Sequence, residues 1–186
     1  MILYVNGNEH SAGAKLVNSY VWANADKAYW ALEDRPHPDN LIVSWSSRLA
    51  SLAKLSLMND CRSNASITSI IERTNEWIEG RQSSDIFVVI GFPSIAEDES
   101  FQQVLTEDEQ LTNLGIKHLF FMNHKYKDDI GFKYSLNNNI LETSYSEYLH
   151  SKNASKVMLS NTYFDSNAHS LWTNYLLSHI VKYNLI

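Results

Sequence analysis

The sequence lacks three features that assign many proteins to a class at once: paired cysteines, basic clusters and long apolar runs. Cys61 is the only cysteine, so an intramolecular disulfide is impossible, nothing indicates an oxidising compartment, and we expect a buried free thiol. The formal net charge of -6 and the absence of any Lys/Arg run argue against nucleic acid as a partner. No apolar run approaches the ~20 residues that span a bilayer, so we expect no membrane partner.

The amino-terminal residues do not have the pattern of a secretion signal. The apolar stretch 1–5 is too short for a signal peptide and has no basic n-region. We therefore expect a protein that is not secreted by a signal peptide and that stays in the cytoplasm or in a particle assembled there.

Length and composition indicate one folded domain covering residues 1–186. A chain of 186 residues suits one sizeable α/β domain better than two. Hydrophobic residues make up 44% and charged residues 19%, and aromatic side chains are plentiful, so disorder is not expected.

Buried strands alternate with amphipathic helices along the chain. Apolar runs predict strands at residues 2–5, 57–61, 85–91 and 116–122, and the run 85–91 has the continuous apolar character of a central parallel strand. Helical spacing predicts helices at 44–56, from Asn64 or Ser66 to Gly80, from Thr106 to Gly115, and from Ser166 or Asn167 to about 183, with 95–103 as a loop or irregular helix. This order predicts a three-layer α/β/α sandwich with a mainly parallel sheet.

The turn after the first strand is where we expect function, because ligands bind beyond the carboxyl ends of parallel strands. The segment 1–13 resembles the opening block of the SGNH/GDSL hydrolase superfamily, in particular small phage-encoded members in which a strand precedes Gly-Asp-Ser-His and an Ala-Gly pair. Asn8 stands in place of the family's Asp, and Glu9 in place of the nucleophilic Ser. The matching positions are Gly7, His10, Ala12 and Gly13.

The resemblance implies an SGNH/flavodoxin-like fold and places the other site residues. In this family a His near the start of the last helix takes the proton of the serine, and an Asp just before it orients the imidazole. His169 matches that His in position and context. Asn167 takes the place of the Asp, with Asp165 as an alternative one residue further away, and an Asn cannot stabilise an imidazolium by charge.

The groups that stabilise an oxyanion are retained in part. Ser63 and Asn64 match the second conserved block of the family, after the second strand. Gly91 matches the leading Gly of the third block, whereas Pro93 replaces its Asn and Ser94 its Asp. Proline provides no donor, so one oxyanion donor is missing unless Ser94 replaces it.

Several interpretations of the altered site remain open. Glu9 and His169 are either a buried, hydrogen-bonded ion pair that fills the pocket, or a base and acid (or a carboxylate nucleophile) for a different hydrolysis. Ser11 is a further candidate, as a displaced nucleophile. A metal site built from Glu9, His10, Asp60 and His169 is chemically conceivable, but no short ligand spacing supports it, so we expect no metal and no cofactor.

The resemblance and the lost serine lead to two functional hypotheses. The first is a phage-type pseudoenzyme that is not catalytic and serves as a binding or virion structural module, in the host cytoplasm or the virion, with protein partners in the phage particle or a small ester or glycan ligand. The second is a hydrolase of ester or acetyl groups with altered Glu/His chemistry. Short p-nitrophenyl esters and a serine-directed fluorophosphonate probe, used together, separate the two: covalent labelling contradicts the first, and silence in both assays weakens the second.

Overall fold

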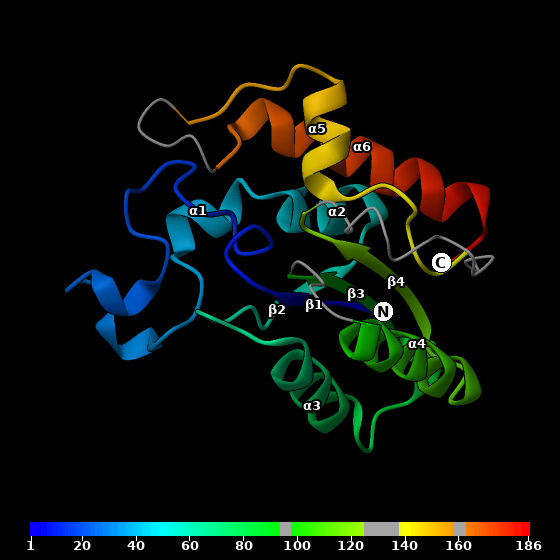
Figure 1. Cartoon of the computed structure of the whole chain (residues 1–186). Helices are drawn as coiled ribbons and strands as arrows, with labels where there is room; N and C mark the ends of the chain where they lie inside the picture. Colours follow the sequence, from blue (N-terminus) through cyan, green and yellow to red (C-terminus); the bar gives the residue numbers. More distant parts are fainter. Residues whose placement is uncertain (94–97, 125–137, 158–162) are drawn as a thin grey trace.

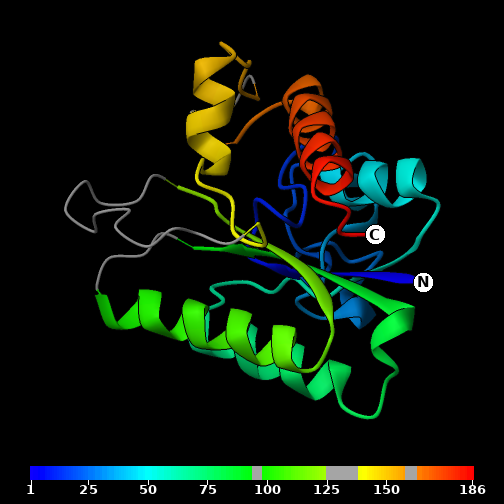
Figure 2. The same cartoon turned by 90° about the vertical axis from the view of Figure 1, so that its right-hand side faces the viewer.

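The computed structural model describes residues 1–93, 98–124, 138–157 and 163–186. The described part contains a parallel four-stranded sheet in the order β2-β1-β3-β4, with helices on both faces (Figures 1 and 2). This confirms the expected α/β sandwich. The strands are β1 (Ile2–Gly7), β2 (Ser56–Asn59), β3 (Ile86–Phe92) and β4 (Lys117–Met122).

The helices form two layers. In Figure 2, α2, α5 and α6 lie above the sheet, and α3 and α4 lie below it. The longer helices are α2 (Trp45–Ala53), α3 (Ile67–Ile78), α4 (Asp98–Asn113), α5 (Tyr145–Ser151) and α6 (Ser166–Lys182). The short elements are α1 (Pro38–Ile42) and the 3-10 turns η1 (Ala23–Ala25), η2 (Trp30–Leu32) and η3 (Ser83–Asp85).

The alternating side chains of the strands supply two cores. One face of the sheet packs against α2 and α6, and the other packs against α3 and α4. Every residue of β3 is buried, as a strand covered on both faces requires. The first core includes Leu3, Val5, Phe87, Val89, Phe121, Trp45 and Trp172, and the second includes Tyr4, Val88, Ile90, Phe120, Ile70 and Val104.

Serine caps fix two helix starts as the sequence predicted. Ser44 accepts from the amide of Ser47 at the start of α2, and Ser66 accepts from that of Ser69 at the start of α3. The predicted cap of α6 was wrong, because Asp165 accepts from the amide of Ala168 and Ser166 is the first helical residue.

Two helices begin earlier than the sequence indicated. The acidic segment expected to be a loop or irregular helix forms the first turns of α4, because Phe101 and Val104 lie one turn apart and are both buried in the second core. The second lies after His37, which is flanked by Pro36 and Pro38, residues that favour extended backbone before them. Pro38 is the first residue of α1, where its missing N–H costs nothing, and His37 caps the helix.

The strand order reverses between β1 and β3, and this positions the site. The chain runs from β1 to β2 on one side and then crosses over to β3 on the other, so a crevice is expected outside the carboxyl ends of β1 and β3. Gly7 and Gly91 are register partners at these ends. Beyond β4, Ile140 makes a parallel bridge with Phe120 and extends the sheet.

Within the described ranges, no helix combines the length and apolar character needed to cross a membrane.

Candidate functional site

One asparagine side chain connects the ends of three strands at the carboxyl edge of the sheet. Asn123 directly follows β4 and is fully buried. Its Nδ2 donates to Oδ1 of Asn8 at 2.8 Å and to the carbonyl oxygen of Gly91 at 3.0 Å. The same Oδ1 of Asn8 accepts from the amide of His10 at 3.2 Å. One side-chain amide therefore links β4 to the ends of β1 and β3.

Ser11 packs directly onto the two glycines at the strand ends. A Cβ on Gly91 would lie 2.4 Å from the Ser11 Oγ and 2.7 Å from the Phe121 ring, and a Cβ on Gly7 would lie 2.8 Å from the same Oγ. Ser11 is completely buried, and its Oγ has no hydrogen-bond partner in the described residues. It therefore fills the space above the glycines, and this position does not suit the displaced nucleophile that the sequence left open.

His169 lies in the first turn of α6 and is fully engaged. Its Nδ1 accepts from the backbone amide of Trp45 at 3.0 Å, and its Nε2 lies 3.1 Å from the Tyr145 hydroxyl. A backbone amide can only donate, so Nδ1 carries no proton, and in the neutral ring the proton is on Nε2, which donates to Tyr145. Burial, with smaller effects from the charges of His10 and Arg48, lowers the pKa of His169 to about 3.

This tautomer has a direct chemical consequence. A histidine that activates a nucleophile needs a lone pair on the nitrogen that faces the substrate and a proton on the other nitrogen, held by an acceptor. Here Nδ1 faces a donor, and Nε2 carries the proton. His169 is therefore arranged as a structural histidine.

The residues considered as orienters of His169 are not the hydrogen-bond partners of its imidazole, which are Trp45 and Tyr145. Asp165 uses Oδ1 to cap α6, where it accepts from the amide of Ala168 at 2.9 Å. Asn167 is exposed on the first turn of the helix. The place of an orienting carboxylate is taken by the amide of Trp45.

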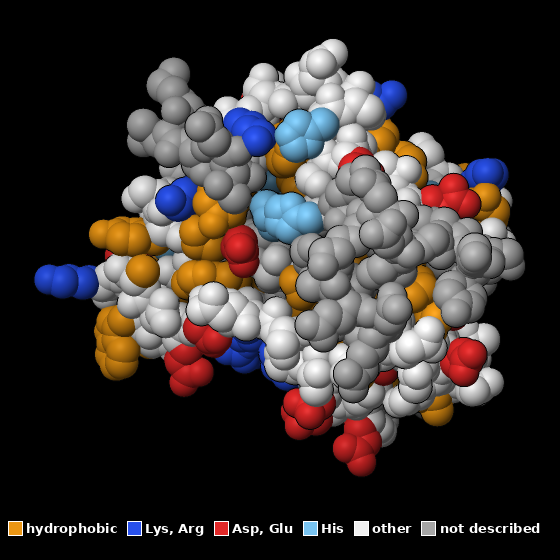
Figure 3. All heavy atoms as spheres, viewed as in Figure 1, with side chains coloured by type: hydrophobic (Ala, Val, Ile, Leu, Met, Phe, Trp, Pro, Cys, Tyr) orange, Lys and Arg blue, Asp and Glu red, His pale blue; other side chains and the backbone are white. Residues whose placement is uncertain are grey.

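Glu9 is partly exposed and does not form the expected ion pair with His169, because both ring nitrogens of His169 have other partners. The charge of Glu9 instead acts on two other residues. It raises the pKa of Tyr163, where burial is the larger cause, and it partly offsets the desolvation that lowers the pKa of His124. In Figure 3, histidine side chains and a carboxylate reach the surface close together near the middle of this face.

His10 connects the exposed and the buried parts of this edge. Its ring lies 4.9 Å from that of His124, edge to face, and 5.7 Å from each of the rings of Tyr145 and Tyr163. Burial, followed by the charge of His124, lowers the pKa of His10 to about 3. The turn after β1 therefore places His10, and not Glu9, on the side of His169.

Few of the residues matched to the second and third blocks of the family lie at the carboxyl edge of the sheet in the described structure. The amide of Arg62 donates to the carbonyl of Gly7 at 3.2 Å, so Ser63 follows a residue that does reach the edge. Asn64 is exposed and has a left-handed backbone with φ of 51°. Pro93 is half-buried, and Ser94 lies outside the described residues.

Asp60 belongs to a charge cluster on the other face of the sheet. It bonds to Arg35, lies 3.5 Å from Nε of Arg62 and 3.7 Å from Nε of Arg73, and accepts from the Tyr4 hydroxyl at 3.0 Å. Three arginines around one carboxylate oppose a metal cation there. Among the residues that the structure describes, no group of three His, Cys, Asp or Glu side chains has an arrangement that holds a metal.

Sequence reasoning did not identify Asn123, His124 or Tyr145 as residues of the site. Asn123 and His124 immediately follow a buried strand at the carboxyl edge, and that position is a usable signal. Tyr145 has no comparable local signal, because only the docking of α5 beside α6 brings its hydroxyl to His169.

Comparison with protein-family models gave no match, and no curated protein matched the chain significantly.

Proposed function

We propose that this chain is an SGNH-hydrolase-like protein of the phage type that has lost its nucleophile and works as a non-catalytic binding or virion structural module. The observation that supports the loss of catalysis is the hydrogen bonding of His169, whose Nδ1 accepts from Trp45 while its Nε2 carries a proton. A serine at position 9 would find no base there. Its partners would be proteins of a phage particle or a small ester or glycan ligand, met in the host cytoplasm or the virion.

The test uses a serine-directed fluorophosphonate probe and short p-nitrophenyl esters on the purified protein. We expect no covalent labelling and no hydrolysis above the buffer rate. Ser11→Ala is the matched control, because it removes the serine that packs on Gly7 and Gly91 at the strand ends. Labelling that disappears in Ser11→Ala would refute the proposal.

Restoring the nucleophile gives a second test. We expect Glu9→Ser to remain inactive toward these esters. The double variant Glu9→Ser/Tyr145→Phe should also be inactive, because the Trp45 amide still holds Nδ1 of His169 unprotonated. Turnover by Glu9→Ser alone, at more than about a hundredfold over the parent, would contradict this account of the site, since a working base contributes ~10²–10⁴-fold.

One observation favours a second candidate, a hydrolase of ester or acetyl groups. Glu9 and His124 interact electrostatically and both reach the surface. In that reaction Glu9 would take a proton from water as the water attacks the carbonyl carbon, and protonated His124 would return a proton to the leaving alkoxide. Matching losses of hydrolysis in Glu9→Gln and His124→Gln, with no fluorophosphonate labelling, would identify this chemistry.

A further inference from the structure

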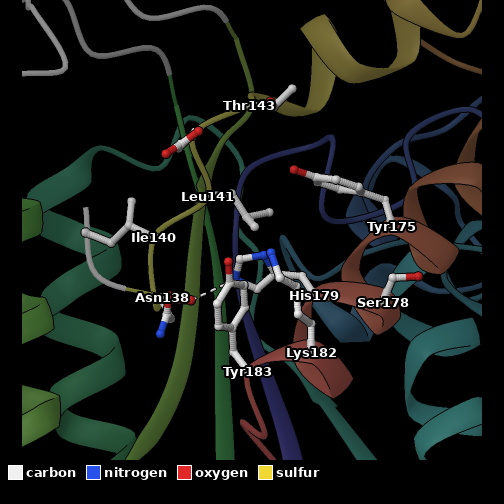
Figure 4. A pocket seen from close by; sticks show the side chains of 10 residues that line it. Asn138, Ile140, Leu141, Thr143, Tyr175, Ser178, His179, Lys182 and Tyr183 are labelled. Carbon is white, nitrogen blue, oxygen red and sulfur yellow. Dashed lines mark hydrogen bonds between the residues drawn. The ribbon is translucent and has the colours of Figure 1, made fainter. Parts of the chain in front are cut away.

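A cavity lies at the end of α6 that is far from His169 and the carboxyl edge of the sheet. It has a volume of about 330 Å³ and is formed between residues 138–143, at the sheet edge beyond β4, and the second half of α6 (Figure 4). His179 at this cavity and His169 at the crevice are ten residues apart on one helix, or about 15 Å along its axis. The volume is at the lower end of the range typical of small-molecule sites.

The floor and walls of the cavity are held by other contacts. The amide of Leu141 donates to the carbonyl of Phe120 at 2.9 Å, which fixes the apolar floor against β4. The Tyr175 ring stacks on Tyr148 with centroids 4.3 Å apart, and its hydroxyl points toward the cavity in Figure 4. A fixed floor and a fixed hydroxyl reduce the cost of ordering the site when a ligand binds.

His179 has a defined hydrogen-bonding role. Its Nε2 lies 2.7 Å from the carbonyl oxygen of Asn138, shown as the dashed line in Figure 4. A carbonyl only accepts, so Nε2 carries the proton, and in the neutral ring Nδ1 is an acceptor. The Tyr183 ring packs against this imidazole at 4.6 Å and has the Lys182 Nζ 4.5 Å from its centroid.

Two side chains of opposite charge line the cavity and are not paired with each other. Lys182 and Glu142 are both lining residues, and the described structure contains no ion pair between them. They still interact at a distance, since a hydrogen bond with Tyr183 raises the pKa of Lys182 and the charge of Glu142 adds to this shift. A ligand with one charge of each sign would be complementary to both groups.

We propose that this cavity binds a small zwitterion with an apolar side chain, such as a free apolar amino acid. The carboxylate lies beside Lys182, the ammonium lies beside Glu142 and the acceptor nitrogen of His179, and the side chain covers Leu141. A neutral sugar fits less well, because the ring of Tyr175 is stacked on Tyr148 and that of Tyr183 is in contact with Lys182 and His179. This site is separate from the crevice and does not depend on the function proposed above.

The binding test is an amide NMR titration of the full chain with L-leucine. Isoamylamine keeps only the ammonium of leucine, isocaproate keeps only its carboxylate, and methyl glucoside is the neutral sugar. We expect L-leucine to saturate below about 10 mM, with shifts concentrated in residues 138–143 and 175–183, and to bind at least about tenfold more tightly than either analogue. Absence of saturation, or tighter binding of the sugar, would overturn the proposal.

Paired variants test the two charges separately. Lys182→Met should weaken the binding of L-leucine by about tenfold and abolish the response to isocaproate. Glu142→Gln should weaken the binding of L-leucine by a similar factor and abolish the response to isoamylamine. Lys27→Met and Glu109→Gln make the same charge changes at exposed positions elsewhere and should leave binding unchanged. All four positions are exposed, so the variants should fold normally. An affinity for L-leucine in Lys182→Met or Glu142→Gln that equals the affinity of the parent protein would refute the assignment.

Discussion

The Tyr145→Phe substitution tests the account of His169 most directly. Tyr145 is almost completely buried, and its hydroxyl is the acceptor for the Nε2 proton of His169. Phenylalanine keeps the ring and its packing and removes only the oxygen. The remaining Nε2–H would then be a buried donor with no partner, which costs about 1–3 kcal/mol of unfolding free energy.

The assay is urea unfolding at neutral pH, with Tyr148→Phe as the matched control. Tyr148 lies on the same helix, but its hydroxyl has no hydrogen-bond partner in the part of the chain that the structure describes. That control should lose less than about 0.5 kcal/mol. In parallel, proton–nitrogen correlation NMR of the imidazole should show the proton on Nε2 of His169 in the parent and in both variants, because the Trp45 amide remains in place.

Two results would refute this reasoning. One is a Tyr145→Phe protein as stable as the Tyr148→Phe control. The other is an imidazole of His169 that carries its proton on Nδ1, or that titrates near the ordinary pKa of 6.5 instead of about 3. Either result would mean that the ring is available as a base, and the argument against catalysis would fail.

Three further predictions concern stability. Because His10 and His169 have folded-state pKa values lowered from 6.5 to about 3, the unfolded chain binds protons that the folded chain excludes, so stability should fall as the pH drops from 6.5 toward 3. Each histidine changes the free energy of unfolding by about 1.4 kcal/mol per pH unit in this range. Urea midpoints measured across the range should therefore fall less steeply with pH in His10→Gln and His169→Gln than in the parent. Gly91→Ala should lower the free energy of unfolding by about 1–3 kcal/mol, because the new Cβ overpacks the site. Gly80→Ala, with φ of +73° and no atom within 4 Å of the new Cβ, should lower it by about 1 kcal/mol through backbone strain alone. Equal losses in the two variants on denaturation would contradict the contacts described. Asp60→Asn should cost roughly 2 kcal/mol or more, because it leaves three arginines without their shared carboxylate, and a thermal midpoint equal to that of the parent would contradict this role.

The sequence was sufficient for the sheet because each strand carries its own signal. The apolar runs of β1, β3 and β4 are buried in the structure as their continuous character predicts. The start of α4 was missed because its acidic residues resemble a solvated loop, and the apolar stripe that begins at Phe101 is recognisable only when the helix is already assumed. Leu171 is apolar yet 37% exposed, because α6 packs through Trp172 and Leu176.

The site was less predictable, because its contacts join segments that are distant in the chain. The hydrogen bond between the Trp45 amide and His169 spans 124 residues, and no local pattern indicates it. The resemblance indicated which positions to examine, and it suggested Glu9 as the partner of His169. The backbone of the turn instead places His10 on that side, and this follows from hydrogen bonds of the turn that residue identities alone do not specify.

Asn123 also limits how the carboxyl edge of the sheet could evolve a larger binding cleft. Its amide holds three strand ends at fixed spacing, and a molecule entering between them would have to replace two hydrogen bonds of a fully buried side chain. Selection for a larger binding cleft would therefore begin with a smaller side chain at position 123, before any change at position 9 could matter.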